Sequence, residues 1–283
     1  MSRTAFAFCA TILACASSAL AQEQPRSFPP EQLRQGTILY PNKGLPEQDP
    51  MPLVKRFEGL RTTDVIDAMQ AVGLQDRGVM DKTIRPLWRD TTDKVAHRFY
   101  GMAITYQYVP TNKPAAGKMP YEEFKKWHSH WYRTYAPETF AQLIRPGHAV
   151  VIDAQGIEDT GFIGSNNALN WYSRGMTGVV TNGSCRDTDE LILQRIPVYS
   201  KYQGGGTRPG RIEAGSINVP VVVGGVLVRP GDIIVADGDG VVVVPLEHVE
   251  EVLKIAHEIA QGDKAGRRKL YEKTGKPPDA TVK

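Results

Sequence analysis

An arginine and an aspartate stand side by side at Arg186 and Asp187, shortly after an apolar run, 176–180, that is typical of a buried strand. The strand is expected to break at Asn-Gly-Ser, 182–184, which leaves both charged side chains just beyond its C-terminal end. A guanidinium fork suits a carboxylate, and an aspartate offers the hard oxygen ligands that Mg²⁺ and Mn²⁺ prefer. The pair could hold an anionic oxo-acid with a metal polarising its carbonyl, although spacing alone favours a pair that closes a turn.

Two further segments are expected to meet this pair. A glycine-containing loop, 159–168, leads into a helix that is expected to begin near Asn166, and the unpaired N–H groups at such a start attract anions. The turn Ala-Asp-Gly-Asp-Gly, 236–240, could bring acidic side chains to the same place. Turns of this composition are common, so a structural role stays open for both segments.

Three other reactive side chains receive less support. Cys185 would need a base or a helix N-terminus to become a nucleophile, and no such partner is visible in the sequence, so a small buried side chain is favoured. His128 and His130 lie two residues apart on an expected helix and point to different faces, unlike the i, i+4 pair of a zinc helix. A pocket-lining role for His128 or the Trp and Tyr residues around it is favoured over a metal role.

The elements that must position these groups are a mixture of short strands and a few helices. Apolar pieces joined by Gly-Gly, Pro-Gly-Asp and Asp-Gly-Asp-Gly turns over 218–245 indicate short strands. Helices are expected over 59–73 and from 246 to about 259. An aromatic-rich stretch, 110–145, interrupts this series of short strands and helices. The pattern favours a mixed β/α core over an eightfold β/α barrel.

The N-terminal residues are expected to be a cleavable secretory signal. They are apolar and free of acids up to Ala19-Leu20-Ala21, which has the small-x-small pattern of a cleavage site, and they are too short and too rich in Ala and Ser for a stable membrane span. Cleavage after Ala21 predicts a periplasmic or secreted protein. A disordered N-terminus and lipidation at Cys15 are the less favoured alternatives.

Composition is that of an ordinary globular chain. The 283 residues are 41% hydrophobic and 23% charged, which suffices for a substantial core, and a net charge of +3 is too small to indicate a nucleic-acid partner. Loss of Cys9 and Cys15 with the signal leaves Cys185 without an internal disulfide partner. The predicted division is a signal at 1–21, an extended segment at 22–52, a catalytic domain at 53–262 with an insertion at about 110–145, and a C-terminal tail at 263–283.

The chain from about residue 60 to residue 245 resembles the family of RraA-like proteins and 4-hydroxy-4-methyl-2-oxoglutarate aldolases. The matching stretches occur in family order and include TTDVIDAM, RPGHAVVIDA, RGMTGVVTNGSCRDTDEL and INVPVVVGGVLVRPGDIIVADGDGVVVVP. The combination of G-x-x-R-D before D-E-L with V-x-P-G-D-x-x-x-A-D-x-x-G-V-x-x-V-P is specific to this family.

The resemblance implies an α/β fold, a swivelling β/β/α domain with mixed sheets and flanking helices, assembled as a homotrimer or hexamer. It also implies a divalent-metal-dependent, class II type carbon–carbon lyase of the aldolase or oxaloacetate decarboxylase kind. Such an enzyme gives pyruvate or a similar enolate product from an oxo-acid or hydroxy-oxo-acid, with Mg²⁺, Mn²⁺ or another divalent metal and without a Schiff-base lysine.

The resemblance also implies roles for individual residues. Asp187 matches the aspartate that holds the metal, and Arg186 matches the arginine that binds substrate and polarises the reacting oxygen. The loop expected to bind the pyruvyl carboxylate is matched by Gly164 and by the backbone of Ser165, Asn166 and Asn167.

Three features depart from the family pattern. The acid that commonly follows the loop glycine is missing, and the glutamate that family aldolases take from a neighbouring subunit is matched only loosely by Glu258 or Asp263. The insertion at 110–145 favours a bulkier or aromatic-derived substrate if it lies over the site.

Two other functions stay open. One is a related lyase or hydratase acting on a sugar acid or an aromatic ring-cleavage product. The other is a non-catalytic binding protein, because the family includes an RNase E inhibitor that works by protein contact. The expected signal argues against that intracellular partner, and the presence of Arg186 and Asp187 favours a working site.

Overall fold

The computed structural model describes residues 38–39 and 49–283. The expected signal at 1–21, with Cys9 and Cys15, lies outside the described residues, as does most of the segment at 22–52. Among the described residues, no helix combines the length and apolar character needed to cross a membrane.

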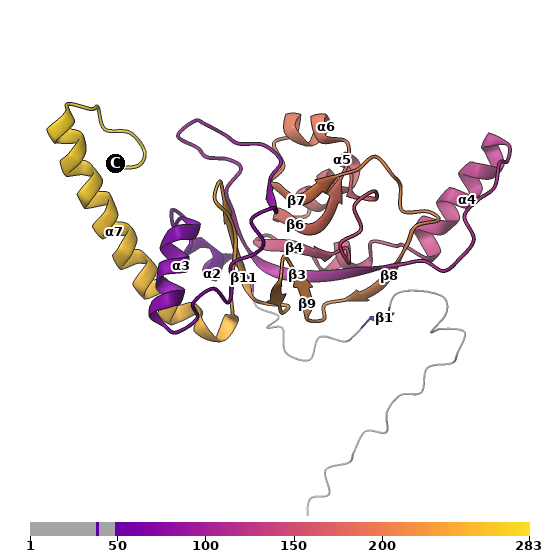
Figure 1. The fold of residues 1–283 in the computed structure, drawn as a ribbon, viewed down its shortest axis with the longest axis horizontal. Coiled ribbons are helices and arrows are strands. Elements are labelled where there is room, and N and C mark those ends of the chain that lie inside the picture. The colour runs from indigo at the N-terminus through magenta and orange to yellow at the C-terminus, as the bar shows by residue number, and fades with distance from the viewer. Residues whose placement is uncertain (1–37, 40–48) are drawn as a thin grey trace, which may run out of the picture.

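A mixed sheet of ten strands forms the centre of the molecule (Figure 1). Its middle is parallel: β3 (Phe99–Pro110), β4 (His148–Asp153), β6 (Met176–Cys185) and β7 (Val198–Gln203) lie in this order. The remaining strands of this sheet are β1 (Ile38–Leu39), β2 (Arg85–Pro86), β5 (Gly161–Ile163), β8 (Ile212–Ile217), β11 (Ile233–Asp237) and β12 (Gly240–Val244). A separate hairpin is formed by β9 (Val221–Val223) and β10 (Val226–Val228).

Helices flank both ends and one face of the sheet. They are α2 (Met51–Lys55), α3 (Thr62–Ala71), α4 (Tyr121–Thr134), α5 (Ser165–Ser173), α6 (Thr188–Leu193) and α7 (Val249–Thr274), with 3-10 turns η1 (Thr139–Leu143) and η2 (Leu246–His248). Figure 1 places α4 and α7 at opposite ends of the long axis, α3 beside α7, and α5 and α6 across the sheet from β9.

The alternation of side chains along β3 explains why both faces of the sheet are covered. Tyr106 and Tyr108 are buried on the face that carries Trp171 of α5, whereas Ala103 is buried on the opposite face against the β9–β10 hairpin. Successive side chains of a strand point to opposite faces, so one long strand serves two cores. A third core forms where α3 and α7 pack on β11 and β12.

Strand β6 does not break at Asn-Gly-Ser as expected but continues to Cys185, with a register shift between Thr181 and Ser184. The reason lies in packing: a Cβ on Gly183 would stand 2.4 Å from the Cβ of Ala154. The glycine therefore permits a close approach inside a strand and does not mark a turn.

The C-terminal part is more ordered than the expected tail at 263–283. Helix α7 runs to Thr274, well past the expected end near 259. The last residues then fold back, with Val282 buried and its carbonyl accepting a hydrogen bond from Arg268. At the other boundary, α2 begins at Met51, inside the segment expected to be extended.

Candidate functional site

The Arg186–Asp187 pair occupies the turn between β6 and α6. Asp187 has φ 55° and ψ 44°, a left-handed conformation that aspartate tolerates better than most residues. The backbone N–H of Arg186 donates to the carbonyl of Ile163 at 2.8 Å, which ties the turn to the end of β5. This geometry places both side chains next to the loop that starts α5.

The carboxylate of Asp187 is held from two sides. Its Oδ2 accepts hydrogen bonds from the backbone N–H of Ser165 at 3.0 Å and from the Ser165 hydroxyl at 3.3 Å, and its Oδ1 accepts from Arg186 Nε at 3.0 Å. Partial burial by itself favours the neutral acid, but these bonds outweigh it and lower the pKa of Asp187. Asp187 is therefore an anion at neutral pH and retains lone pairs for a cation.

The guanidinium of Arg186 keeps most of its donors free. Within the part of the chain that the structure describes, only Nε has a hydrogen-bond partner, and the side chain is 34% exposed. Its stem lies on Gly161, where a Cβ would come within 2.6 Å of Arg186 Cδ, and a Cβ on Gly164 would come within 3.0 Å of Asp187 Oδ2. Two glycines thus allow the pair to lie close against the loop.

The first turn of α5 supplies backbone donors beside this pair. The first hydrogen bond of the helix runs from Ala168 N to Gly164 O at 2.9 Å, so the N–H groups of Asn166 and Asn167 have no partner within the helix. The N–H of Ser165 is taken by Asp187. Of the loop residues predicted to bind a carboxylate, Gly164 and Ser165 thus lie against Asp187. The backbone N–H groups of Asn166 and Asn167 stay available to an anion.

An acid that the sequence analysis missed stands beside this loop. Glu138, from the insertion, accepts hydrogen bonds from the side chains of Asn167 and of Trp171, the latter at 2.9 Å. Its Oε1 lies 2.5 Å from an Nη of Arg208, which is 1% exposed and also donates to the carbonyl of Phe162. No local spacing relates residue 138 to residue 167, so only the tertiary structure reveals this acid.

Helix α4 of the insertion also borders the site. Burial, together with the positive charge of Arg186, lowers the pKa of His128. Tyr132, one turn further on, has its ring centroid 5.6 Å from Arg208 Cζ. His130 instead lies beside Thr134, 3.4 Å from its hydroxyl. Over the described ranges no cluster of three or more His, Cys, Asp or Glu side chains could hold a metal.

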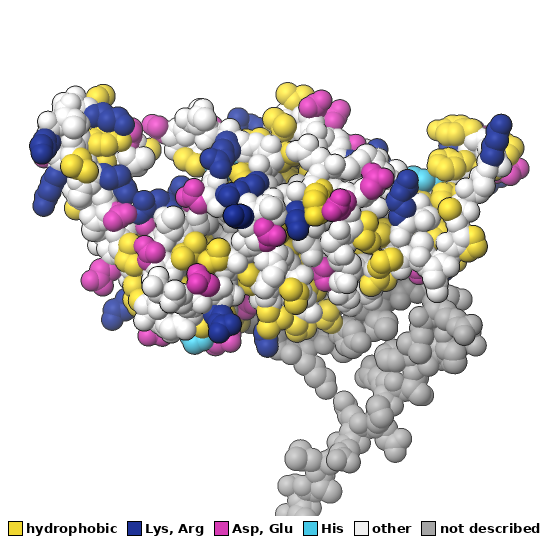
Figure 2. Space-filling view, viewed as in Figure 1, with side chains coloured by type: hydrophobic (Ala, Val, Ile, Leu, Met, Phe, Trp, Pro, Cys, Tyr) yellow, Lys and Arg dark blue, Asp and Glu magenta, His cyan; other side chains and the backbone are white. Residues whose placement is uncertain are grey.

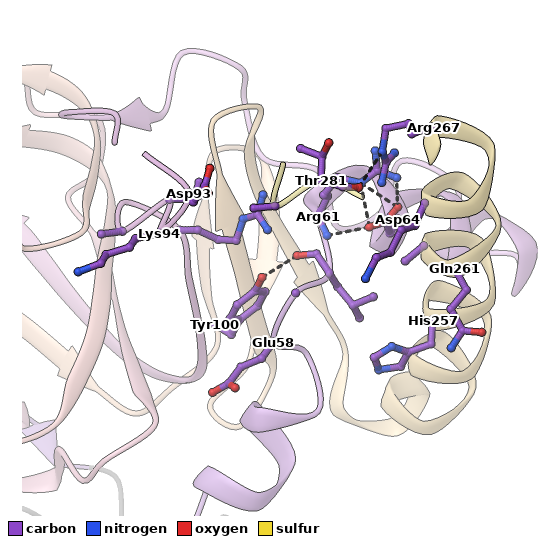
Figure 3. Close-up of a pocket in the computed structure, with 18 residues that line it drawn as sticks. Glu58, Arg61, Asp64, Asp93, Lys94, Tyr100, His257, Gln261, Arg267 and Thr281 are labelled. Carbon is purple, nitrogen blue, oxygen red and sulfur yellow. Dashed lines mark hydrogen bonds and ion pairs between the residues drawn. The ribbon is translucent and has the colours of Figure 1, made fainter. Parts of the chain in front are cut away.

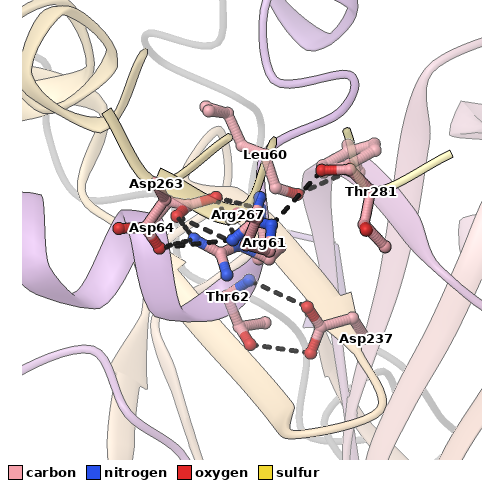
Figure 4. Close-up of polar contacts among 9 residues, drawn as sticks. Leu60, Arg61, Thr62, Asp64, Asp237, Asp263, Arg267 and Thr281 are labelled. Carbon is pink, nitrogen blue, oxygen red and sulfur yellow. Dashed lines mark hydrogen bonds and ion pairs between the residues drawn. The ribbon is translucent and has the colours of Figure 1, made fainter. Parts of the chain in front are cut away.

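The turn at 236–240 does not join this site, contrary to expectation. The buried Asp237 accepts hydrogen bonds from the backbone N–H and hydroxyl of Thr62, at 2.9 and 2.7 Å, and so anchors the start of α3 (Figure 4). Because β11 pairs with the first residues of β3, and β12 pairs with β11, the turn between β11 and β12 reaches α3. The acid is structural.

A cavity of about 710 Å³ lies at this same end of the molecule, between the turn before α3, the loop 93–98 and α7 (Figure 3). Figure 3 shows Arg61, Asp64 and Arg267 gathered at one wall and His257 projecting from α7. Arg61 is bound by Asp64 and Asp263, so its charge is neutralised by its own neighbours. At this wall of the cavity the charges of Arg61, Asp64 and Asp263 are paired with one another.

Cys185 is buried, as favoured, and its Sγ lies 3.3 Å from the hydroxyl of Ser200. Burial raises the pKa of this thiol, so it is protonated at neutral pH. Among the residues that the structure describes, no base lies in hydrogen-bond contact with this thiol.

Comparison with known proteins defines the class to which this fold and site belong. The RraA-like family model, Aldolase/RraA, matches residues 62–243. The chain belongs to this Aldolase/RraA family.

Individual relatives refine this assignment. A protein of Halalkalibacterium halodurans named as a candidate 4-hydroxy-4-methyl-2-oxoglutarate aldolase is 30% identical over 228 residues, which are 80% of this chain and 91% of the relative. A 4-hydroxy-4-methyl-2-oxoglutarate aldolase of Thermus thermophilus is 33% identical over 100 residues, which are 35% of this chain and 60% of that protein. Relatives that carry the aldolase name thus support a lyase family.

The fold has solved counterparts. RraAS2 of Streptomyces coelicolor, described as an unusual member of the RNase ES inhibitor RraA family, superposes with a TM-score of 0.62 at 23% identity, over 79% of this chain and 99% of that protein. The expected α/β fold with a mixed sheet and flanking helices is confirmed.

Proposed function

We propose that this protein is a divalent-metal-dependent carbon–carbon lyase of the aldolase or decarboxylase type, which converts an oxo-acid or hydroxy-oxo-acid to pyruvate or a similar enolate product. The observation that carries the proposal is the pair at the end of β6. Asp187 is fixed and anionic, and Arg186 beside it holds free Nη donors. The aldolase names of the relatives support the same reaction class.

Asp187 is the residue that would hold the metal. Its carboxylate fits Mg²⁺ or Mn²⁺ because it is ionised, fixed by Ser165, and a third exposed, and Mg²⁺ is commonly bound through one or two carboxylates with water in the other positions. A divalent ion bound there supplies Lewis-acid polarisation of the substrate carbonyl.

Groups of the protein itself bind the substrate and stabilise the charge that develops during the reaction. The free N–H groups of Asn166 and Asn167 bind the substrate carboxylate at the positive end of α5. The Nη groups of Arg186 donate to the oxygen that becomes negative as the bond between C3 and C4 breaks. A water takes the proton that leaves the 4-hydroxyl, and C3 of the enolate is protonated to give pyruvate.

The test is oxaloacetate decarboxylation by the purified mature protein with Mg²⁺ or Mn²⁺, compared between the wild type and Asp187→Asn. Asp189→Asn is the matched control, because it removes an exposed acid two residues away. We expect the Asp187 variant to lose about 10²–10³-fold in kcat and the control to stay near the wild type. Equal rates for all three proteins, or no turnover of any oxo-acid, would contradict the proposal.

Export and assembly belong to the same proposal. The mature enzyme is periplasmic or secreted after cleavage behind Ala21 and works as a homotrimer or hexamer. Mass spectrometry of protein from a periplasmic extract should give a mature chain that begins at Gln22, and light scattering should give three or six times its mass. An intact N-terminus in the cytoplasm, or a monomer, would contradict this part alone.

A further inference from the structure

Helix α4 carries three rings in one row. Phe124, His128 and Tyr132 are spaced by four residues, and their ring centroids lie 5.4 and 5.0 Å apart. Residues four apart share a face of a helix. We name this row the ring ladder. It differs from the neighbouring row of Trp127 and Trp131, which packs on the body of the protein, where Trp131 Nε1 donates to the carbonyl of Ile212.

The inner end of the ring ladder meets the proposed site. The ring of Tyr132 lies 5.6 Å from the Cζ of Arg208. Arg208 is paired with Glu138, and Glu138 holds the side chain of Asn167 in the first turn of α5. At His128, in the middle of the ladder, burial and the positive charge of Arg186 lower the pKa of the imidazole. The ladder therefore starts beside the ion pair that holds the carboxylate-binding turn, and it runs from there out along α4.

The outer end of the ladder is open. Phe124 is 38% exposed, and His128 and Tyr132 are only partly buried. Figure 1 shows α4 projecting from the body, and Figure 2 shows hydrophobic side chains gathered over its end. A row of accessible rings whose inner end lies beside the first turn of α5, with its N–H donors, is complementary to a ligand with a carboxylate at one end and a flat apolar group at the other.

We propose that the ring ladder selects an aryl-substituted 4-hydroxy-2-oxo acid, with its carboxylate at the start of α5 and its aryl group stacked on Phe124 and His128. This substrate class rests on the proposed lyase function. Cleavage breaks the bond between C3 and C4, and the bonding electrons remain on the pyruvyl fragment. The 4-hydroxyl proton is lost to solvent and a proton is taken up at C3, so the products are pyruvate and an aryl aldehyde, with no other reactant.

The catalytic test compares 4-hydroxy-2-oxo-4-phenylbutanoate with oxaloacetate in the wild type, Phe124→Ala, His128→Ala and the double variant. Tyr121→Ala is the matched control: it is an aromatic residue of the same helix, 71% exposed, outside the ladder. Each single ladder variant should raise KM for the aryl substrate about 3- to 10-fold, with oxaloacetate changed less than twofold. Equal effects on both substrates, or an equal effect of Tyr121→Ala, would overturn the assignment.

A binding measurement separates this inference from the proposed function. Calorimetry should give phenylpyruvate a Kd at least tenfold below that of pyruvate, and the double variant should remove that preference. If no oxo-acid is turned over but the preference and its loss are seen, the ladder assignment stands and the lyase proposal fails. If both acids bind alike or not at all, or if the double variant dissociates an oligomer and leaves the Kd ratio unchanged, the ladder assignment fails.

Discussion

Two arginine–aspartate clusters, one at each end of the sheet, use the same side chains for different purposes. At the start of α3, Arg61 uses Nε and an Nη on Asp64 and Asp263, and the backbone N–H of Arg61 donates to Asp64 at 2.8 Å. At the end of β6, the Arg186 side chain bonds, within the described part of the chain, through Nε alone, to Asp187. The first cluster pairs its own charges and caps a helix, whereas the second leaves Nη donors open to water or to a ligand.

Cavity size favours the Arg61 cluster over the site proposed above. The cavity of about 710 Å³ is lined by Arg61 and Asp64, which form an ion pair with each other. The hydrogen bonds to Asp64 and Asp263 raise the pKa of Arg61 despite its partial burial. At the Arg186 site, within the described residues, the Nη groups of the guanidinium have no hydrogen-bond partner. The proposed function rests on the unpaired Nη donors of Arg186 next to the fixed carboxylate of Asp187, because the fold does not require such an arrangement.

The largest expected effect is on catalysis by Arg186→Gln. Loss of the charged Nη donors at the developing negative oxygen should lower kcat about 10²–10³-fold while the melting temperature changes little, because the side chain is a third exposed and makes a single hydrogen bond. Steady-state kinetics and thermal unfolding of the same preparation measure both. A variant that unfolds early and keeps its kcat would reverse the roles of the two clusters.

The matching change at the other cluster should affect stability instead. Arg61→Gln leaves the carboxylate of Asp64, which is 1% exposed, without its cationic partner, at a cost of about 1–3 kcal/mol in the free energy of unfolding. Urea unfolding measures this loss, and kcat of the folded variant should match the wild type. A fall in kcat as large as that of Arg186→Gln would place chemistry in the large cavity.

A smaller effect concerns the titration of Asp187. Its folded pKa lies below the ordinary 3.8, so its contribution to stability is present above that value and is lost as the pH falls through the folded pKa. Arg186→Gln removes a cation and should raise the pKa of Asp187, whereas Arg61→Gln should leave it unchanged. A carboxyl ¹³C NMR titration, with Asp187→Asn to assign the signal, measures the shift. Equal shifts in both variants would mean that the two clusters are electrostatically coupled.

The sequence predicted those features that local rules govern. The start of α5 near Asn166 and the turn after α3 at Gly73, with φ +84°, follow from capping and glycine chemistry. Arg186 and Asp187 were found because they are adjacent in a specific motif. The ring spacing of α4 was also visible, but which of its two aromatic rows meets the site is set by packing.

Contacts between residues far apart in the chain could not be predicted from the sequence. Glu138 contacts Asn167 and Arg208 only because the order of strands in the sheet places the insertion beside α5 and beside the loop between β7 and β8. The prediction that the turn at Asp237 joins the site was wrong for the same reason. The hydrogen-bond partner of Asp237, Thr62, lies 175 residues away in the sequence. Such pairs obey no spacing rule, and each is fixed by the order of strands in the sheet.

The smallest effect is expected next to the site, at Cys185→Ala. The thiol is buried and protonated, and its one polar contact is with Ser200, so it contributes packing and no charge. The variant should keep kcat within about twofold and lose about 1 kcal/mol of stability from the small void. The native thiol should react with a thiol reagent only as fast as the protein opens. A fast-reacting thiol, or a large loss of kcat, would mean that the end of β6 carries a nucleophile and that Arg186 serves it instead of an enolate oxygen.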